Sequence, residues 1–333
     1  MPYAEINGIR LHYEEEGDGT PVVLITGFSG DSSFFRQMIP ELSSRYRVIV
    51  LDNRGAGTTE YCVGNAEPQD FVDDVLALMD YLHIFRAHML GWSFGGHIAQ
   101  EFAIQHPDRL ITLTLVSAYP YRPARASYFM NGIVDCALRG GDPEYISMMT
   151  NAFCFTEDFF SGMEAKGKTL RSLKGLDPRK LKDQMHALDG FDTRDKLQNI
   201  SVPTLSVHGL SDIMVEPKLG DFISDRIPGC KVLRIPNAGH IVKPSLYLRE
   251  FMDHMASHER GLDYRRLESG GGNGRCRCRL LMASRFRSCL HLKHGPDPPY
   301  CPGFCPQIII CPLNCSGNNN KDRCNRRHRI RIR

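Results

Sequence analysis

A serine in the pattern Gly-x-Ser-x-Gly lies at residues 91–95, which read Gly-Trp-Ser-Phe-Gly. Residues 87–90 before it predict a buried strand, and residues 98–104 after it predict a helix. A serine in such a sharp strand-to-helix turn has strained backbone angles, and its hydroxyl projects at the edge of a sheet. The N–H of Phe94 would lie at the helix N-terminus, where an oxyanion is stabilised. This context favours a nucleophilic Ser93 over a passive serine in a glycine-rich turn.

A serine hydroxyl needs a base, and the base needs an acid that orients it. Asp212 follows the predicted strand 203–207, and His240 follows the predicted strand 231–235. Because the carboxyl ends of parallel strands lie at one edge of a sheet, we expect both residues to meet Ser93 there. Taken singly, Asp212 could be a cap or turn residue and His240 a surface-loop histidine. His208, close to Asp212, is interpreted as a loop residue.

The elements that must position these residues alternate between strand and helix. Hydrophobic runs predict further strands, and Asn-Gly at residues 7–8 predicts a hairpin. The predicted strands are 4–6, 9–11, 22–25, 46–51 and 111–116, with helices opening at Pro68 and over 245–255. Residues 119–189 break the alternation and are typical of a helical insertion. The pattern predicts a mostly parallel sheet that is covered on both faces.

Residues 1–258 resemble the α/β-hydrolase fold family, of the esterase and lactonase type. Four blocks carry the resemblance: Thr-Gly-Phe at 26–28, Asp-Asn-Arg-Gly-Ala-Gly at 52–57, the turn at 91–96, and the Asp212/His240 pair. It implies a mostly parallel central sheet flanked by helices, with core segments 1–118 and 190–258 and an inserted helical cap at 119–189. It implies neither a cofactor nor a metal.

The resemblance also suggests further site residues. The residue after the first glycine, Phe28, supplies the second oxyanion N–H beside that of Phe94, and Gly27 and Trp92 are candidates for the substrate pocket. Residues 52–57 form a structural loop in the family, so we expect Asp52 and Arg54 to hold a turn. Thr26 and Thr59 depart from the family, which usually has His and Ser there. Thr26 leaves open how the oxyanion loop is held.

The implied function is a serine hydrolase that cleaves a carboxylic ester or lactone through an acyl-enzyme intermediate. Residues 187–204 are similar to the cap-to-core return of 3-oxoadipate enol-lactonases, which favours a small ester or lactone as substrate. Serine at position 93 argues against haloalkane dehalogenases and epoxide hydrolases, which need a carboxylate there. Three alternatives stay open: a C–C bond hydrolase, a perhydrolase-type enzyme with the same residues, and a non-catalytic ligand-binding protein.

The formal net charge of +3 over 333 residues conceals two unlike parts. Residues 1–260 hold 26 Lys and Arg against 34 Asp and Glu, whereas residues 261–333 hold 15 against 4 together with eight of the twelve cysteines. The sequence contains no apolar run of the ~18–20 residues that a membrane helix needs. Its start lacks the pattern of a secretory signal. We therefore expect a cytoplasmic protein without a membrane partner.

The tail at residues 259–333 is Cys- and Arg-rich and shows no helical or strand periodicity. Its cysteines at 301, 305, 311 and 315 leave a central gap of five residues, which is short for a structural zinc site. Its arginines could bind nucleic acid by charge, but no recognition fold accompanies them, so we expect no such partner. We expect a disordered or non-native appendage. The sequence gives no indication of the oligomeric state.

Overall fold

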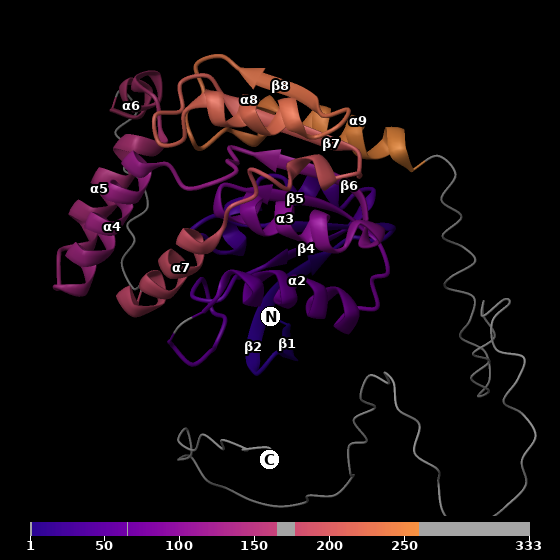
Figure 1. The fold of residues 1–333 in the computed structure, drawn as a ribbon, viewed down its shortest axis with the longest axis horizontal. Helices are drawn as coiled ribbons and strands as arrows, with labels where there is room; N and C mark the ends of the chain where they lie inside the picture. Colours follow the sequence, from indigo (N-terminus) through magenta and orange to yellow (C-terminus); the bar gives the residue numbers. More distant parts are fainter. Residues whose placement is uncertain (1, 65, 165–176, 260–333) are drawn as a thin grey trace, which may run out of the picture. The chain divides into compact units, whose positions relative to one another are not determined.

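The computed structural model describes residues 2–64, 66–164 and 177–259, so the expectations for the rest of the tail lie outside the described residues. Within these ranges the chain forms an eight-stranded sheet in the order β1-β2-β4-β3-β5-β6-β7-β8 (Figure 1). β1 and β2 form a hairpin, β2 runs antiparallel to β4, and all other neighbours are parallel. The strands are β1 (Tyr3–Ile6), β2 (Ile9–Glu16), β3 (Thr20–Ile25), β4 (Tyr46–Leu51), β5 (Ala87–Trp92), β6 (Leu110–Val116), β7 (Thr204–Gly209) and β8 (Lys231–Ile235).

The hairpin turn is the one that Asn-Gly predicts, since Asn7 and Gly8 both have positive φ angles, 46° and 73°. β2 nevertheless continues to Glu16, five residues beyond its expected end. Its last three residues are glutamates, which hide the strand in the sequence. They are accommodated by polar partners: Glu15, for example, accepts a hydrogen bond from Arg47 at 2.6 Å.

Helices cover both faces of the sheet, as predicted for a parallel arrangement. Alternate residues of each central strand enter different hydrophobic clusters: Val23 and Ile25 face one side, and Val22 and Leu24 the other. The first side packs on α2 (Pro68–Tyr81), α3 (Phe94–Gln105) and α8 (Pro217–Arg226), and the second on α1 (Ile39–Leu42) and α9 (Leu248–His258). The sequence does not predict α1, which is a single turn, or α8, whose polar residues obscure its apolar stripe. The predicted start of α9 at residue 245 is too early, because residues 244–246 form a separate 3₁₀ turn.

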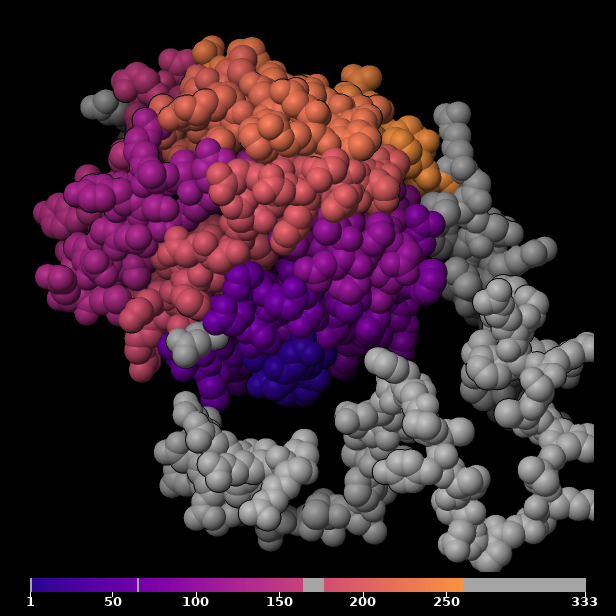
Figure 2. Space-filling model, viewed as in Figure 1, coloured from indigo at the N-terminus to yellow at the C-terminus, as the bar shows by residue number. Residues whose placement is uncertain are grey.

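Within the described residues, four α-helices lie between β6 and β7, and we call them the cap. They are α4 (Ala124–Leu138), α5 (Pro143–Cys154), α6 (Glu157–Glu164) and α7 (Pro178–Gly190). In Figure 1 they lie together at the left of the sheet. Figure 2 shows the surface of the cap continuing into that of the core, with the pink surface of α7 against the purple surface of the core. None of the helices in the described ranges combines the length and the hydropathy needed to cross a membrane.

The burial of the apolar face of α3 leads to a prediction about the stability of the fold. The Phe102 side chain is fully buried, so Phe102→Ala should lower the free energy of unfolding by about 3–5 kcal/mol through lost burial and the cavity left behind. Phe85 is 64% exposed, and Phe85→Ala should change stability by less than about 0.5 kcal/mol. Urea unfolding of the full chain measures both. Similar values for the two variants would contradict the core assignment.

Candidate functional site

Ser93 lies in the turn between β5 and α3, which confirms the predicted strand–turn–helix arrangement. Its backbone is in the left-handed region, with φ 53° and ψ −114°, an unfavourable conformation for a residue with a side chain. The Ser93 N–H donates to the carbonyl of Val116 on the neighbouring strand at 2.9 Å. A Cβ at Gly95 would lie only 2.3 Å from the carbonyl oxygen of Ile25, so glycine is required for α3 to approach β3.

At the carboxyl edge of the sheet, His240 contacts the Ser93 hydroxyl, and Asp212 contacts the other side of the His240 ring. His240 Nε2 lies 2.9 Å from Ser93 Oγ, and His240 Nδ1 lies 2.9 Å from Asp212 Oδ2. All three residues are buried. With Asp212 ionised, Nδ1–H donates to the carboxylate, and Nε2 is left as the acceptor for the serine hydroxyl. This is the hydrogen-bond order that a serine needs in order to lose its proton to a base.

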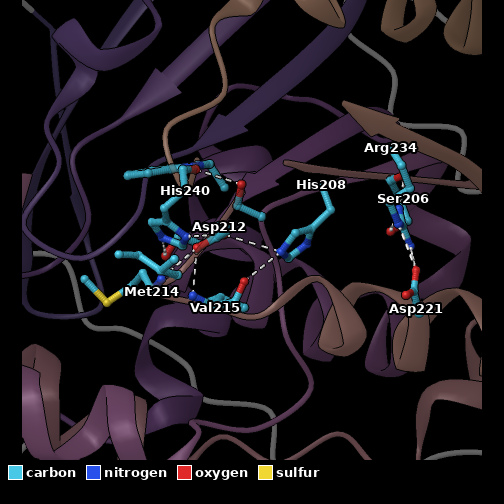
Figure 3. Close-up of polar contacts among 12 residues, drawn as sticks. Ser206, His208, Asp212, Met214, Val215, Asp221, Arg234 and His240 are labelled. Atoms are coloured by element: carbon cyan, nitrogen blue, oxygen red, sulfur yellow. Dashed lines mark hydrogen bonds and ion pairs between the residues drawn. The ribbon is translucent and has the colours of Figure 1, made fainter. Parts of the chain in front are cut away.

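Asp212 remains a carboxylate although it is buried. Burial would raise its pKa, but the attraction of His240 and the side-chain contacts of His208 and His240 outweigh burial and hold the pKa at about 2. The other oxygen, Oδ1, accepts the backbone N–H groups of Met214 and Val215 at 3.0 and 2.8 Å. Figure 3 shows these groups gathered around the single carboxylate. Asp212 can therefore fix the orientation of His240 without accepting its proton.

His208 does not lie in a loop, contrary to the expectation from the sequence. It is a fully buried residue of β7, and its Nε2 lies 3.0 Å from the Val215 carbonyl and 3.4 Å from Asp212 Oδ2 (Figure 3). The sequence places it beside Asp212, but the alternation of the strand did not show which way the ring points. The structure shows that His208 lies near Oδ2 of Asp212, the same carboxylate oxygen that His240 Nδ1 contacts.

The backbone of His240 is held from two sides. Its carbonyl accepts hydrogen bonds from Trp92 Nε1 at 3.2 Å and from Ser117 Oγ at 2.8 Å. The next residue, Ile241, donates its N–H to the carbonyl of Cys154, the last residue of cap helix α5, at 3.1 Å. The loop that carries His240 is therefore fixed by both the core and the cap.

A cavity of about 400 Å³ opens beside Ser93 and His240. Its wall is mostly apolar and comes from the core and the cap together. Besides Ser93 and His240, the core contributes Phe28, Ser29, Gly30, Asp31, Ser33, Phe34, Trp92, Tyr119, Arg122, Met214, Val215 and Ile241; the cap contributes Ala126, Met130, Ile133, Thr150, Asn151, Cys154, Leu181 and Leu188. Such a volume suits a small organic molecule.

The pocket residues expected from the sequence divide into two groups. Trp92 lines the cavity, and its ring stacks on Phe34 with 4.1 Å between the ring centres. Phe28 also lines it. Gly27 is not among the lining residues: it lies behind them, where a Cβ would be 2.5 Å from the Trp92 ring, so its role is to permit close packing. The Phe94 side chain is fully buried in the core, which leaves only its backbone for the site.

Tyr119 is a site residue that the sequence analysis missed. It lines the cavity and its side chain interacts with that of Ser93. Burial raises the pKa of its phenol, which therefore stays protonated. The signal was available, because residue 119 follows β6 at the edge where Ser93 lies. The cap residues could not be found in this way, since helical spacing alone does not show which face covers the core.

Arg122 brings a cation to the cavity wall, but its charge is matched within the protein. Its guanidinium donates to Ser127 Oγ at 2.7 Å and to Asn131 Oδ1 at 2.9 Å, and it contacts Met185 Sδ. It also forms an ion pair with Asp189 at 2.9 Å. Burial lowers the pKa of Arg122, and Asp189 opposes that shift. The cavity wall is therefore mostly apolar, and Arg122, the only arginine or lysine that lines it among the described residues, is already paired.

Asp52 and Arg54 have the structural contacts expected of them. Asp52 accepts hydrogen bonds from the N–H groups of Ser32 and Thr58 at 2.7 and 2.9 Å. Arg54 binds Asp74 through two nitrogens at 2.5 and 2.9 Å. Over the described ranges, no cluster of three or more His, Cys, Asp or Glu side chains could hold a metal ion.

The depressed pKa of Asp212 makes part of the stability depend on pH. Because this pKa is about 2 in the fold and 3.8 ordinarily, the ionised form stabilises the protein above about pH 4, and the contribution is lost as the pH falls toward 2. We expect the free energy of unfolding of the wild type, measured with urea on the full chain, to fall between about pH 5 and pH 2. The fall should be about 2 kcal/mol larger than that of the Asp212→Asn variant over the same pH range. Asp108→Asn, at an exposed site, should retain the wild-type loss. Equal losses in wild type and Asp212→Asn would contradict this account.

Comparisons with known proteins agree with this fold. The family model of the alpha/beta hydrolase fold matches residues 20–244. One relative is RutD of Azorhizobium caulinodans, which is provisionally named a carbamate hydrolase. It is 27% identical to this chain over 248 residues, and the match covers 72% of this chain and 91% of that protein. The pimeloyl-acyl-carrier-protein methyl ester esterase of Aeromonas hydrophila is 28% identical over 267 residues, covering 74% of this chain and 99% of that protein.

A solved structure shows the same similarity in three dimensions. The enol-lactonase from Burkholderia xenovorans LB400 superposes with a TM-score of 0.70 at 25% identity, covering 77% of this chain and 100% of that chain. The eight-stranded, mostly parallel sheet with its flanking helices is the fold that the sequence predicted. With the family model matching more than half of its length, the chain belongs to the α/β hydrolase fold family and is a hydrolase.

Proposed function

We propose that this protein is a serine hydrolase that cleaves a small carboxylic ester or lactone through an acyl-enzyme intermediate. The observation that carries the proposal is the hydrogen-bonded series Ser93–His240–Asp212 at the wall of a cavity of about 400 Å³. A nucleophile, a base and an orienting carboxylate in this order perform acyl transfer on unrelated folds. Here they lie where a small substrate can reach them.

In the acylation step, His240 Nε2 accepts the proton of Ser93 Oγ while this oxygen attacks the carbonyl carbon of the substrate. The negative charge that develops on the carbonyl oxygen is stabilised by the backbone N–H groups of Phe28 and Phe94. Protonated His240 then gives its proton to the leaving alkoxide as the C–O bond breaks. Asp212 stabilises the imidazolium and keeps its ring oriented.

Deacylation repeats these roles with water as the nucleophile. His240 takes a proton from the water, whose oxygen attacks the acyl carbon, and the proton returns to Ser93 as the acid is released. For a lactone, the alcohol and the acid belong to one molecule, so the opened ring stays attached to Ser93 until water arrives. Tyr119, which stays protonated beside Ser93, can donate a hydrogen bond to the oxygen of the leaving group or of the water.

The lining of the cavity and the names of two relatives support an ester or a lactone as the class of substrate. The wall is mostly apolar and Arg122 is already paired with Asp189, which favours an uncharged, compact acyl group. The relatives whose names specify an ester or an enol-lactone support attack on a carboxylic carbonyl. A carbamate, the substrate class in the name of RutD, presents the same kind of carbon and belongs in any substrate panel.

The direct test is Ser93→Ala assayed with short p-nitrophenyl esters and a panel of lactones. We expect kcat to fall by at least about 10⁴-fold, because no other group replaces the nucleophile. A fluorophosphonate probe should add its mass to Ser93 in the wild type and not in the variant. Ser44→Ala is the matched control, since Ser44 is an exposed residue that precedes the amino end of β4, at the opposite edge of the sheet.

The outcomes separate the alternatives. Turnover retained by Ser93→Ala would overturn the proposal. Labelling of Ser93 without turnover of any ester, lactone or carbamate would redirect it to C–C bond hydrolysis or a perhydrolase-type reaction. Absence of both labelling and turnover in the wild type would favour a non-catalytic ligand-binding protein.

A further inference from the structure

Gln184 of cap helix α7 is fully buried and joins two loops of the core. Its Oε1 accepts the backbone N–H of Ser29 at 2.8 Å, and its Nε2 donates to the backbone carbonyl of Arg54 at 2.6 Å. Both ends of the amide are therefore used. No motif in the sequence marks Gln184 as a functional residue.

The Ser29 contact falls on the segment that carries a proposed oxyanion donor. Ser29 follows Phe28 directly, and its φ is 58°, a left-handed conformation that is costly for a residue other than glycine. A hydrogen bond to the N–H of Ser29 offsets that cost and fixes the orientation of the peptide group between residues 28 and 29. That peptide adjoins the N–H of Phe28.

The two ends of this loop, at residues 26 and 30, are held by the core itself. Thr26 Oγ1 donates to the Gly30 carbonyl at 2.8 Å, and Asn53 Nδ2 donates to the Thr26 carbonyl at 3.0 Å. Neither contact reaches residues 28 and 29. The threonine that replaces the usual histidine of the family thus closes the loop, and the centre of the loop is held by Gln184.

The second core loop is shaped to receive the same amide. Gly55 has a φ of 80°, and a Cβ there would lie 3.1 Å from Cγ and 3.3 Å from Nε2 of Gln184. The absence of a side chain at residue 55 therefore leaves space for Gln184 to enter between the loops. Two independent features therefore lie against the Gln184 side chain: the strained backbone of Ser29 and the absence of a side chain at Gly55.

We propose that Gln184 is a positioning residue that holds the Phe28 N–H in place for the oxyanion, an inference that rests on the proposed serine-hydrolase function. An oxyanion donor stabilises the transition state only when it is fixed where the charge develops. By this contact, the cap takes part in building the oxyanion site as well as in covering the cavity.

The test is Gln184→Met, which keeps the length of the side chain and removes both hydrogen bonds. We expect kcat and kcat/KM for a p-nitrophenyl ester to fall together by about 10- to 100-fold, less than the ~10²–10³-fold loss of a donor itself. The affinity for a trifluoromethyl ketone, which forms an oxyanion on Ser93, should weaken by a similar factor. Inhibition by the alcohol that corresponds to this ketone, which Ser93 cannot attack and which forms no oxyanion, should stay unchanged.

Two further variants provide the controls. Gln184→Glu keeps an acceptor for Ser29 and should lose less activity than Gln184→Met. Asp183→Asn alters the neighbouring residue of α7, which binds Tyr61 and the N–H of Gly64 instead of the oxyanion loop. It should leave both kcat and ketone affinity near the wild-type values. If Gln184→Met does not fold, Gln184→Asn, a polar side chain too short to span both loops, replaces it with the same expectation.

Unchanged kcat and ketone affinity in the variant that lacks the Ser29 contact would overturn the inference. A rise in KM alone would overturn it too, because that result would assign Gln184 to substrate binding. Failure of the proposed function is distinguishable from both: in that case the wild type shows no turnover that depends on Ser93, whatever residue 184 is.

Discussion

The hydrogen bond between Ser93 Oγ and His240 Nε2 joins residues 147 positions apart, and the arrangement of the site depends on it. Its length is set by two features of the backbone. The strained turn after β5 projects the serine hydroxyl above the sheet, and the loop after β8 is held by Trp92, Ser117 and the end of α5. A parallel sheet brings these points together because all the strands involved end at one edge.

The buried charge beside this bond is stabilised locally. A carboxylate removed from water is costly unless several donors surround it. Asp212 has the N–H groups of Met214 and Val215 on one oxygen, and the rings of His240 and His208 near the other. The negative charge is thus retained where it orients His240, which explains why the pKa of Asp212 stays low despite burial.

The cap contributes to the site through specific contacts as well as apolar cover. Cys154 at the end of α5 accepts a hydrogen bond from Ile241, next to His240. Gln184 on α7 binds Ser29, next to Phe28. Arg122, between β6 and α4, donates hydrogen bonds to Ser127 and Asn131 of α4 and pairs with Asp189 of α7. It thereby joins the two helices. Movement of these helices would therefore shift the loops that carry His240 and Phe28.

The sequence by itself determined the order of the strands along the chain, the hairpin at Asn7-Gly8 and the turn around Ser93. These features depend on local rules: positive φ at Asn and Gly, short apolar runs for buried strands, and small residues at a tight strand-to-helix turn. Asp212 and His240 could be named in advance because a parallel sheet places the residues after its strands at one edge. The glutamates of β2 and the polar face of α8 concealed those elements, since polar residues in a partly exposed element leave a weak pattern.

Only the tertiary structure decided which cap residues meet the cavity and what holds the loops around it. Met130 and Leu181 line the cavity, and Gln184 enters between two core loops, because the helices of the cap pack on the core in one particular orientation. The spacing of residues in a helix repeats about every 3.6 positions whichever face is buried. Gly27 illustrates the same limit from the core side. Its place behind Trp92 depends on a close approach between segments that are 65 residues apart, which no local pattern encodes.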